Sequence, residues 1–317
     1  KIFILKKGRI TMELQYKRYQ NYLGKNYSFL KEASRLPIMA RLKYISILCG
    51  MDYATPYAYH ILFYISRLDH SMDTAKITYR LTKSKREALI ALFHDACTPV
   101  FSHVIDYVNG DFLRQESTEE KQEEIILSSK ELQEYLKNEG ISVYDLIDFK
   151  SHSIVDYKRP HLCADRISNT LCSGFNLGGN VDFETSKLVI DHLALFKNEE
   201  GKLEIGFSSS EAADAFLEIN ERINQITHSS VDHYMMLLLA KIVKHLLDHR
   251  YLTEMDLYTK EEIEVMMLIE EWSKVDETLR TFWYEFKHKK VFPEDIKLNV
   301  KDRIVRPIVL GKRYNGK

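Results

Sequence analysis

Two adjacent residues that can bind a metal ion, His94 and Asp95, follow a strongly apolar segment, Ala88–Phe93. Burying an imidazole and a carboxylate among apolar side chains costs free energy unless another group satisfies them. A divalent cation would do so, because neutral imidazole nitrogen and carboxylate oxygen are ligands for Mn, Fe, Co, Ni or Zn. The alternative interpretation is a His–carboxylate hydrogen bond inside a protein core.

Two further residues, His70 and Asp165, are candidates to complete such a site, because each lies beside apolar residues in a helical pattern. They are needed because adjacent residues on a helix point about 100° apart and cannot enclose an ion alone. The other possibilities are that His70 lies on a helix surface and that Asp165 pairs with Arg166 or caps a helix.

The segments that would position these residues are predominantly helical. Apolar residues recur at spacings of three and four, which is typical of amphipathic helices. The pattern covers Leu36–Leu48, Tyr57–Thr82, Lys85–Phe93, Glu119–Leu136, Glu211–Ile226 and Val231–Leu247. The last of these is apolar nearly all round, which predicts a helix deep in the core. Pro99 is best tolerated in the first turn of a further helix through Val100–Asn109.

Strand patterns are few. Leu193–Phe196 and Leu203–Phe207 predict a hairpin, and Ile304–Leu310 contains Pro307, which limits it to an edge strand. We therefore expect a mainly α protein, a multi-helix bundle with a small β hairpin attachment in its C-terminal third. The expected parts are a helical extension over residues 1–36, a core over 37–250 with the hairpin near 193–207, and a C-terminal helical and edge-strand segment over 251–317.

Composition narrows the possible partners. The 317 residues include 45 Lys and Arg and 46 Asp and Glu, and the net charge of −1 argues against nucleic acid or a membrane surface as a partner. The most apolar stretch, Met235–Val243, is far shorter than the roughly 20 residues that span a bilayer. The four cysteines show no C-x-x-C spacing, which favours a reducing cytoplasm. P-loop, G-x-G-x-x-G, G-x-S-x-G and H-E-x-x-H motifs are absent from the sequence.

The ordered residues His70, His94-Asp95 and Asp165 resemble the H…HD…D signature of the HD-domain metal-dependent phosphohydrolases. Their flanks are similar to those of the deoxynucleotide triphosphohydrolase (dGTPase-like) branch. Arg67-Leu-Asp-His-Ser71 resembles R-F-E-H-S, His94–His103 resembles H-D-x-G-H-x-P-F-S-H, Ala164-Asp-Arg166 resembles D-A-D-R, and Pro37–Lys43 resembles P-x-x-Q-R-L-R. The resemblance covers roughly residues 37–178 and is looser over 228–247.

The resemblance implies a set of site residues. His70, His94, Asp95 and Asp165 would bind one divalent ion (Mn, Fe, Ni, Co, Zn or Mg), which would activate a water molecule. Arg67, His103 and Arg166 match positions that face substrate phosphates, and guanidinium groups suit that role. Asp95, His103 and Asp106 would take part in catalysis, with Asp106 orienting the His103 imidazole. Ordinary salt bridges for the arginines and a buried imidazole without function for His103 are the alternatives.

The sequence also departs from the branch. Thr98 stands where the second His of H-D-x-G-H is expected, and Glu119-Glu120 is the nearest substitute for an H-E pair that supplies a general acid. Ala40 replaces a Gln that contacts the sugar, and Ser173 replaces an Asp. The resemblance therefore implies the fold and the metal more firmly than the substrate.

We expect a metal-dependent phosphohydrolase acting on a nucleotide or related phosphate ester, with a deoxynucleoside triphosphate hydrolase as the narrower candidate. Oligomers are common in the resembled family, so a homo-oligomer is expected. The alternatives are a catalytically inactive HD-fold nucleotide sensor and a helical scaffold without a metal.

A second group of histidines, His228, His233, His245 and His249, has mixed spacing. Without a cysteine or a clear carboxylate set, the sequence favours core packing or an oligomer surface over a second metal site.

Overall fold

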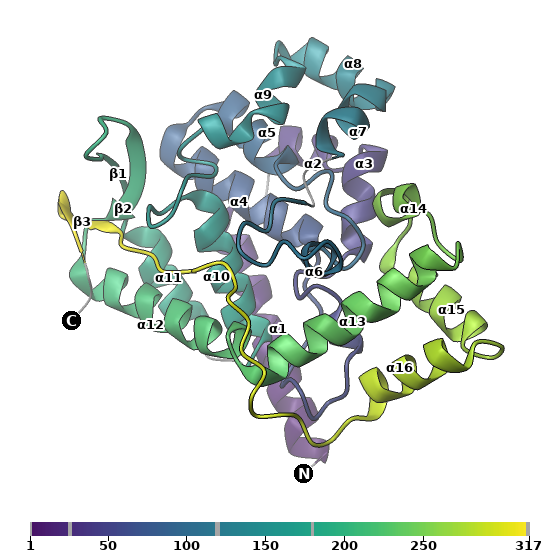
Figure 1. Ribbon diagram of the computed structural model, residues 1–317. Coiled ribbons are helices and arrows are strands. Elements are labelled where there is room, and N and C mark those ends of the chain that lie inside the picture. The colour runs from purple at the N-terminus through teal and green to yellow at the C-terminus, as the bar shows by residue number, and fades with distance from the viewer. Residues whose placement is uncertain (1, 25–26, 118–120, 179–180, 315–317) are drawn as a thin grey trace.

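The computed structural model describes residues 2–24, 27–117, 121–178 and 181–314, and helices account for most of them (Figure 1). The mainly α prediction is confirmed. The helices that come before the sheet are α1 (Ile2–Leu23), α2 (Ser28–Ala33), α3 (Pro37–Ala40), α4 (Arg67–Thr82), α5 (Lys85–Phe93), α6 (Val104–Val108), α7 (Gln122–Ser128), α8 (Lys130–Glu139), α9 (Val143–Ile147), α10 (Ala164–Asn176) and α11 (Phe183–Asp191). Short 3₁₀ turns cover Arg41–Tyr44, Met51–Tyr53 and Phe149–Ser151.

The later helices flank and follow a small sheet. They are α12 (Ser210–Thr227), α13 (Ser230–Asp248), α14 (Glu254–Thr259), α15 (Glu262–Trp272) and α16 (Glu277–His288). The strands are β1 (Leu193–Lys197), β2 (Leu203–Phe207), β3 (Ile308–Val309) and β4 (Lys312–Arg313). None of the helices among the described residues has the length and apolar character needed to span a bilayer.

The start of α4 differs from the prediction and fixes one site residue. The predicted start of this helix at Tyr57 was wrong, because Ser66 caps the helix and Arg67 is its first residue. Ser66 and Asp69 form a capping box, in which the Ser66 hydroxyl accepts the Asp69 N–H and the Asp69 carboxylate accepts the Ser66 N–H at 3.0 Å. Ser66 itself is extended and is bridged to Ser46. The cap places Arg67 in the first turn and His70 at the start of the second.

Three other predicted helices are shorter than expected. The helix expected over 36–48 stops at Ala40 and continues as a 3₁₀ turn, and that expected over 119–136 breaks at Ser129 into α7 and α8. The helix expected from Val100 begins at Val104, because Phe101 and Ser102 have positive φ angles of 60° and 46°.

The hairpin is confirmed as β1 and β2, but the edge strand is not at an edge. β3 lies between β2 and β4, pairing parallel to β2 and antiparallel to β4. Pro307 lies just before this two-residue strand, so its missing N–H removes no bond from the β3 pairing.

Helix α4 lies between two apolar clusters and packs against both α5 and α10. Ala75 belongs to the cluster formed with α5, α13 and α16, and Ile77 belongs to the cluster formed with α1, α10, α12 and the sheet. The expected core helix is α13, in which Met235, Leu239 and Ile242 are fully buried. The division of the chain into three parts, with boundaries after residues 36 and 250, remains a proposal.

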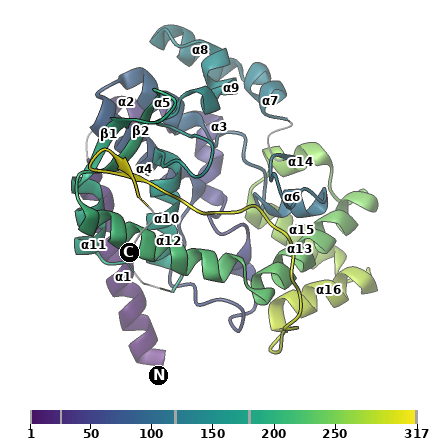
Figure 2. The same cartoon turned by 60° about the vertical axis from the view of Figure 1, so that its left-hand side comes forward.

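An extended segment, residues 289–307, leaves α16 and crosses the molecule to β3; we name it the C-terminal strap (Figures 1 and 2). Backbone hydrogen bonds hold it along the way. The Lys301 N–H donates to Phe112 O at 2.9 Å and the Arg306 N–H to Pro160 O at 2.9 Å. Because exposed residues such as Asp302 and Ile304 alternate with the more buried Arg303 and Val305, the strap presents one side to the protein.

The end of the strap depends on a close approach at Gly206, which pairs with Ile308 and where any Cβ would collide with the Ile308 carbonyl oxygen. We expect Gly206→Val to lower the free energy of unfolding by about 1–3 kcal/mol, because the strands must separate to admit the side chain. Leu203→Ala, at the exposed end of the same strand, is the control and should change it by less than about 0.5 kcal/mol. Urea unfolding measures both, and equal stabilities would contradict the pairing.

Candidate metal centre and adjoining cavity

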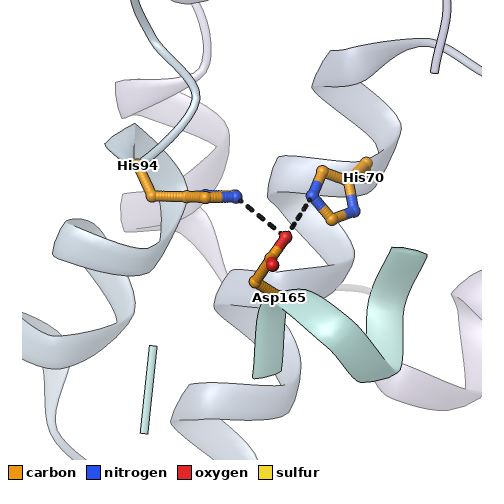
Figure 3. Close-up of side chains that lie close together, drawn as sticks. All are labelled: His70, His94 and Asp165. Carbon is orange, nitrogen blue, oxygen red and sulfur yellow. Dashed lines mark hydrogen bonds and ion pairs between the residues drawn. The ribbon is translucent and has the colours of Figure 1, made fainter. Parts of the chain in front are cut away.

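Three helices bring two imidazoles and a carboxylate to one point (Figure 3). His70 comes from α4, His94 from the end of α5 and Asp165 from the first turn of α10. Asp165 Oδ1 lies 3.1 Å from His70 Nε2 and 3.4 Å from His94 Nε2. One ligand atom from each of the three residues lies within 4.8 Å of the others.

The fourth predicted ligand, Asp95, lies beside the two imidazoles but outside the group of three whose ligand atoms are all within 4.8 Å of one another. Its Oδ2 is 3.6 Å from His70 Nε2 and 3.7 Å from His94 Nε2, and it accepts a hydrogen bond from Arg67 at 3.0 Å. Arg67 is buried in the first turn of α4 and therefore orients Asp95 towards the imidazoles. Asp95 thus lies within 3.7 Å of both imidazoles and Asp165 within 3.4 Å of both, so the four predicted ligands are neighbours in the structure.

Hydrogen bonds on the far side of each ring determine which nitrogen carries a proton. The Ser168 hydroxyl donates to His70 O at 3.0 Å, so at 2.9 Å it must accept from His70 Nδ1–H. His94 Nδ1–H donates to Ala91 O at 2.7 Å. In a neutral imidazole, both Nε2 atoms then carry a lone pair directed at Asp165.

Two lone pairs and two carboxylates facing one another repel unless a cation or a proton lies between them. His94 Nε2 is buried and has no partner in hydrogen-bonding geometry among the described residues. Two ligand atoms about 2.1 Å from one ion lie about 3.0 Å apart at a right angle and about 3.4 Å apart at the tetrahedral angle. The observed separations of 3.1–3.7 Å are close to these values, so the residues fit a divalent transition metal.

The same charges shift the proton equilibria of the site. Burial disfavours the charged imidazole, but the Asp95 and Asp165 carboxylates outweigh it and raise the pKa of His94 to about 9. Burial opposes ionisation of Asp95 as well, yet His94 and Arg67 hold the pKa of that carboxyl below its usual range. Without a metal ion, the site therefore holds a proton on His94 at neutral pH.

A cavity of about 240 Å³ adjoins the site and is lined by His94, Asp95 and Asp165. A smaller one of about 80 Å³ touches the His94-Asp95 pair and His103. Substrate-sized space therefore reaches the candidate metal ligands directly.

His103 lines both cavities and pairs, as predicted, with the buried Asp106 behind it. His103 Nδ1–H donates to Asp106 Oδ2 at 2.9 Å, and Ser117 Oγ donates to Asp106 Oδ1 at 2.7 Å. Burial, together with the positive charges of Arg67 and Arg303, lowers the pKa of His103. His103 is therefore a neutral imidazole that Asp106 holds in place, and Nε2 of His103 can accept a proton.

The two arginines that were predicted to face substrate phosphates, Arg67 and Arg166, have different hydrogen-bond partners. Arg67 and Arg166 both line the cavity, but the Arg166 guanidinium donates to His161 O at 2.7 Å, to Tyr157 O and to Asp156 at 3.3 Å. Arg166 pairs with Asp156 and not with its neighbour Asp165, so it holds the loop before α10 in place.

Three cations at the cavity were missed from the sequence: Arg159, Lys301 and Arg303. Arg159 Nε has no hydrogen-bond partner among the described residues, and Arg303 donates to Gln115 Oε1 at 3.1 Å. Burial and the neighbouring Arg166 lower the pKa of Arg159 to about 10, and burial with Arg159 lowers the pKa of Lys301. Cations that repel one another in this way favour an anionic ligand. No motif marks these residues, because Lys301 and Arg303 reach the cavity only through the strap.

The cavity continues along α10 away from the metal ligands. Asn169, Thr170 and Ser173 line it on α10 and face Asn220, Asn224 and Thr227 of α12. From Asp165 to Ser173 the helix rises about 12 Å, at about 1.5 Å per residue. The uncharged polar part of the wall thus extends along α10 away from Asp165.

The departures from the resembled branch fall in different places. Thr98 lines the smaller cavity and Ser173 the larger one, whereas Ala40 lines neither. Glu119 and Glu120, the substitutes for a general acid, lie outside the described residues.

Metal uptake should depend on pH, because the ion must displace the proton of His94. With a pKa of about 9 for that imidazole, metal affinity should rise about tenfold per pH unit from about pH 6 to pH 9 and then level off. Titration calorimetry at about pH 7.5 in buffers of different ionisation enthalpy should show release of about one proton per ion. An affinity that is constant over this range would contradict the assigned proton.

Comparison with known proteins gives a family for part of the chain. Residues 67–170, which include all four candidate ligands, match the HD domain family. Over 252 residues the chain is 25% identical to Uncharacterized protein YdhJ of Bacillus subtilis (strain 168), covering 77% of this chain and 74% of that protein. The match over residues 67–170 supports an HD domain, and with it the HD-domain superfamily, for this part of the chain.

Proposed function

We propose that this protein is a metal-dependent phosphohydrolase that acts on a nucleotide or a related phosphate ester. The observation that carries the proposal is the convergence of His70, His94 and Asp165 beside a cavity that His94 and Asp165 line together with several cations. The HD domain suggests the same class of reaction, because its members are generally metal-dependent hydrolases.

A divalent ion held by these ligands would supply Lewis-acid chemistry at a phosphoryl group and make water more acidic. The chain's own residues would position the reactants. Arg67 keeps Asp95 turned towards the site. His103, neutral and oriented by Asp106, would accept a proton at Nε2.

The shape of the cavity supports the substrate class. Arg159, Lys301 and Arg303 would bind phosphate oxygens through charge-assisted hydrogen bonds. The uncharged wall between α10 and α12 would contact the rest of the molecule, and its hydroxyl and amide groups suit a sugar or a base. Deoxynucleoside triphosphates are the narrower proposal, and they rest on the flanking sequences alone.

Asp165→Ala should remove about one bound metal ion per chain and lower phosphate-ester hydrolysis at least about 100-fold, since it deletes the carboxylate shared by both imidazoles. Metal content is measured by elemental analysis, and product release is measured with Mn²⁺ over a panel of nucleotides. Asp248→Asn, an exposed carboxylate on α13, is the control and should change neither.

Full metal content in Asp165→Ala would contradict the site. A wild-type protein that nucleotides stabilise thermally, but that releases no product with any metal, would instead be the nucleotide sensor. The replacement of the motif His by Thr98 is the observation that favours this second candidate.

The strap allows a matched test of substrate binding. Arg303 lines the cavity and Arg306, three residues later, is exposed. Arg303→Gln should raise KM for a phosphorylated substrate about 10- to 100-fold, the effect of losing one charge-assisted hydrogen bond of about 1.5–3 kcal/mol. Arg306→Gln should stay within about twofold of wild type, since surface substitutions of this kind change little. Equal KM values for both variants would show that Arg303 of the strap does not bind the substrate.

A further inference from the structure

A second His–carboxylate cluster joins the end of α13 to the start of α16. His245 and His249 lie one turn apart on α13, and their rings stack with centroids 4.0 Å apart. His245 Nε2 lies 2.7 Å from Oδ2 of Asp276, the residue that caps α16. One ligand atom from each of the three residues lies within 4.8 Å of the others.

The carboxylate is the part that the sequence did not provide. His245 and His249 were expected to serve core packing or an oligomer surface, because no carboxylate set accompanied them. Asp276 lies 27 residues after His249 and comes to the cluster because α16 packs against α13. None of the three residues lines the cavity beside the HD-domain ligands, so this cluster is separate from the proposed catalytic site.

The chemistry of the donor atoms in the cluster suits a metal ion. His249 Nδ1–H donates to His245 O at 2.9 Å, so Nε2 carries the lone pair of a neutral ring, and the residue is exposed. Asp276 Oδ1 accepts the Leu279 N–H at 2.9 Å, while Oδ2 faces the histidines and accepts from His245 Nε2 at 2.7 Å and from the Tyr251 hydroxyl at 3.5 Å. Imidazoles four residues apart lie on one helix face.

We propose that His245, His249 and Asp276 form a second transition-metal site, of the kind that Zn²⁺ or Ni²⁺ occupies. On binding, the proton of His245 moves from Nε2 to Nδ1 by exchange with solvent, so the ring stays neutral and its Nε2 lone pair binds the ion, while Asp276 Oδ2 changes partner from the Nε2 proton to the ion. With three protein ligands, water completes the coordination. The ion would tie α13 to α16 in a position away from the cavity.

The count of bound Zn²⁺ at about pH 7.5, measured by equilibrium dialysis, tests this proposal. The wild-type chain should bind about two ions, and His249→Gln and Asp276→Asn about one each. His288→Gln, an exposed histidine at the other end of α16, is the matched control and should keep two. Asp165→Ala should also lose one ion, and its combination with His249→Gln should lose both. Failure of the HD-domain site and failure of this site are therefore distinguishable.

A spectroscopic readout checks the location. The rings of Trp272 and Tyr251 stack with their centroids 3.9 Å apart, and the Tyr251 and His249 ring centroids are 5.6 Å apart. A paramagnetic Ni²⁺ in the cluster should therefore quench Trp272 fluorescence. Quenching should persist in Asp165→Ala and disappear in His249→Gln. Asp276→Asn keeps the capping oxygen, so its thermal unfolding without metal reports whether the fold is intact. An unchanged Zn²⁺ count in His249→Gln, with unchanged quenching, would overturn the proposal and leave the cluster as an ion pair between two helices.

Discussion

The interaction on which the HD-domain site depends is the approach of two imidazole lone pairs to a pair of carboxylates in a buried place. The Ser168 hydroxyl accepts a hydrogen bond from His70 Nδ1–H, and the Ala91 carbonyl accepts one from His94 Nδ1–H. Neither ring can therefore turn this N–H towards Asp165. A bound cation or a proton must then occupy the space between them. The raised pKa of His94 reflects the same requirement, because without a metal ion a proton occupies that space.

This requirement constrains the scaffold. Helix α4 has to present His70 to α5 and α10 at the same time, and it can do so because its two sides belong to different apolar clusters. The Ser66 cap sets where α4 begins and so fixes both Arg67 and His70. Helix α10 supplies a ligand, Asp165, and one turn later the serine that orients His70. Ligand and orienting group therefore move together.

The two His–carboxylate clusters differ in their surroundings. In the HD domain, His70 is fully buried and an unpaired charge would be costly, so an ion there would be held by desolvated ligands. The His249 ring is exposed to solvent, and His245 and Asp276 already satisfy each other through a contact of 2.7 Å. We therefore expect the first cluster to bind metal more tightly than the second.

Sequence alone was sufficient for the helical class and the β1–β2 hairpin, because periodicity is a local property of the chain. The four residues proposed as metal ligands came from the resemblance to an ordered motif, and the structure places them beside one another. Sequence alone was not sufficient where distant segments decide. The break before α4 depends on the Ser66 cap and on bridging to Ser46, and β3 became an inner strand because β4 follows it. Arg159, Lys301, Arg303 and Asp276 carry no local pattern; they enter their sites only because the strap and α16 pack where they do. Local pattern thus determined which groups could hold an ion, and tertiary packing decided which charges surround it, since electrostatic interactions depend on distance in space and not on distance along the chain.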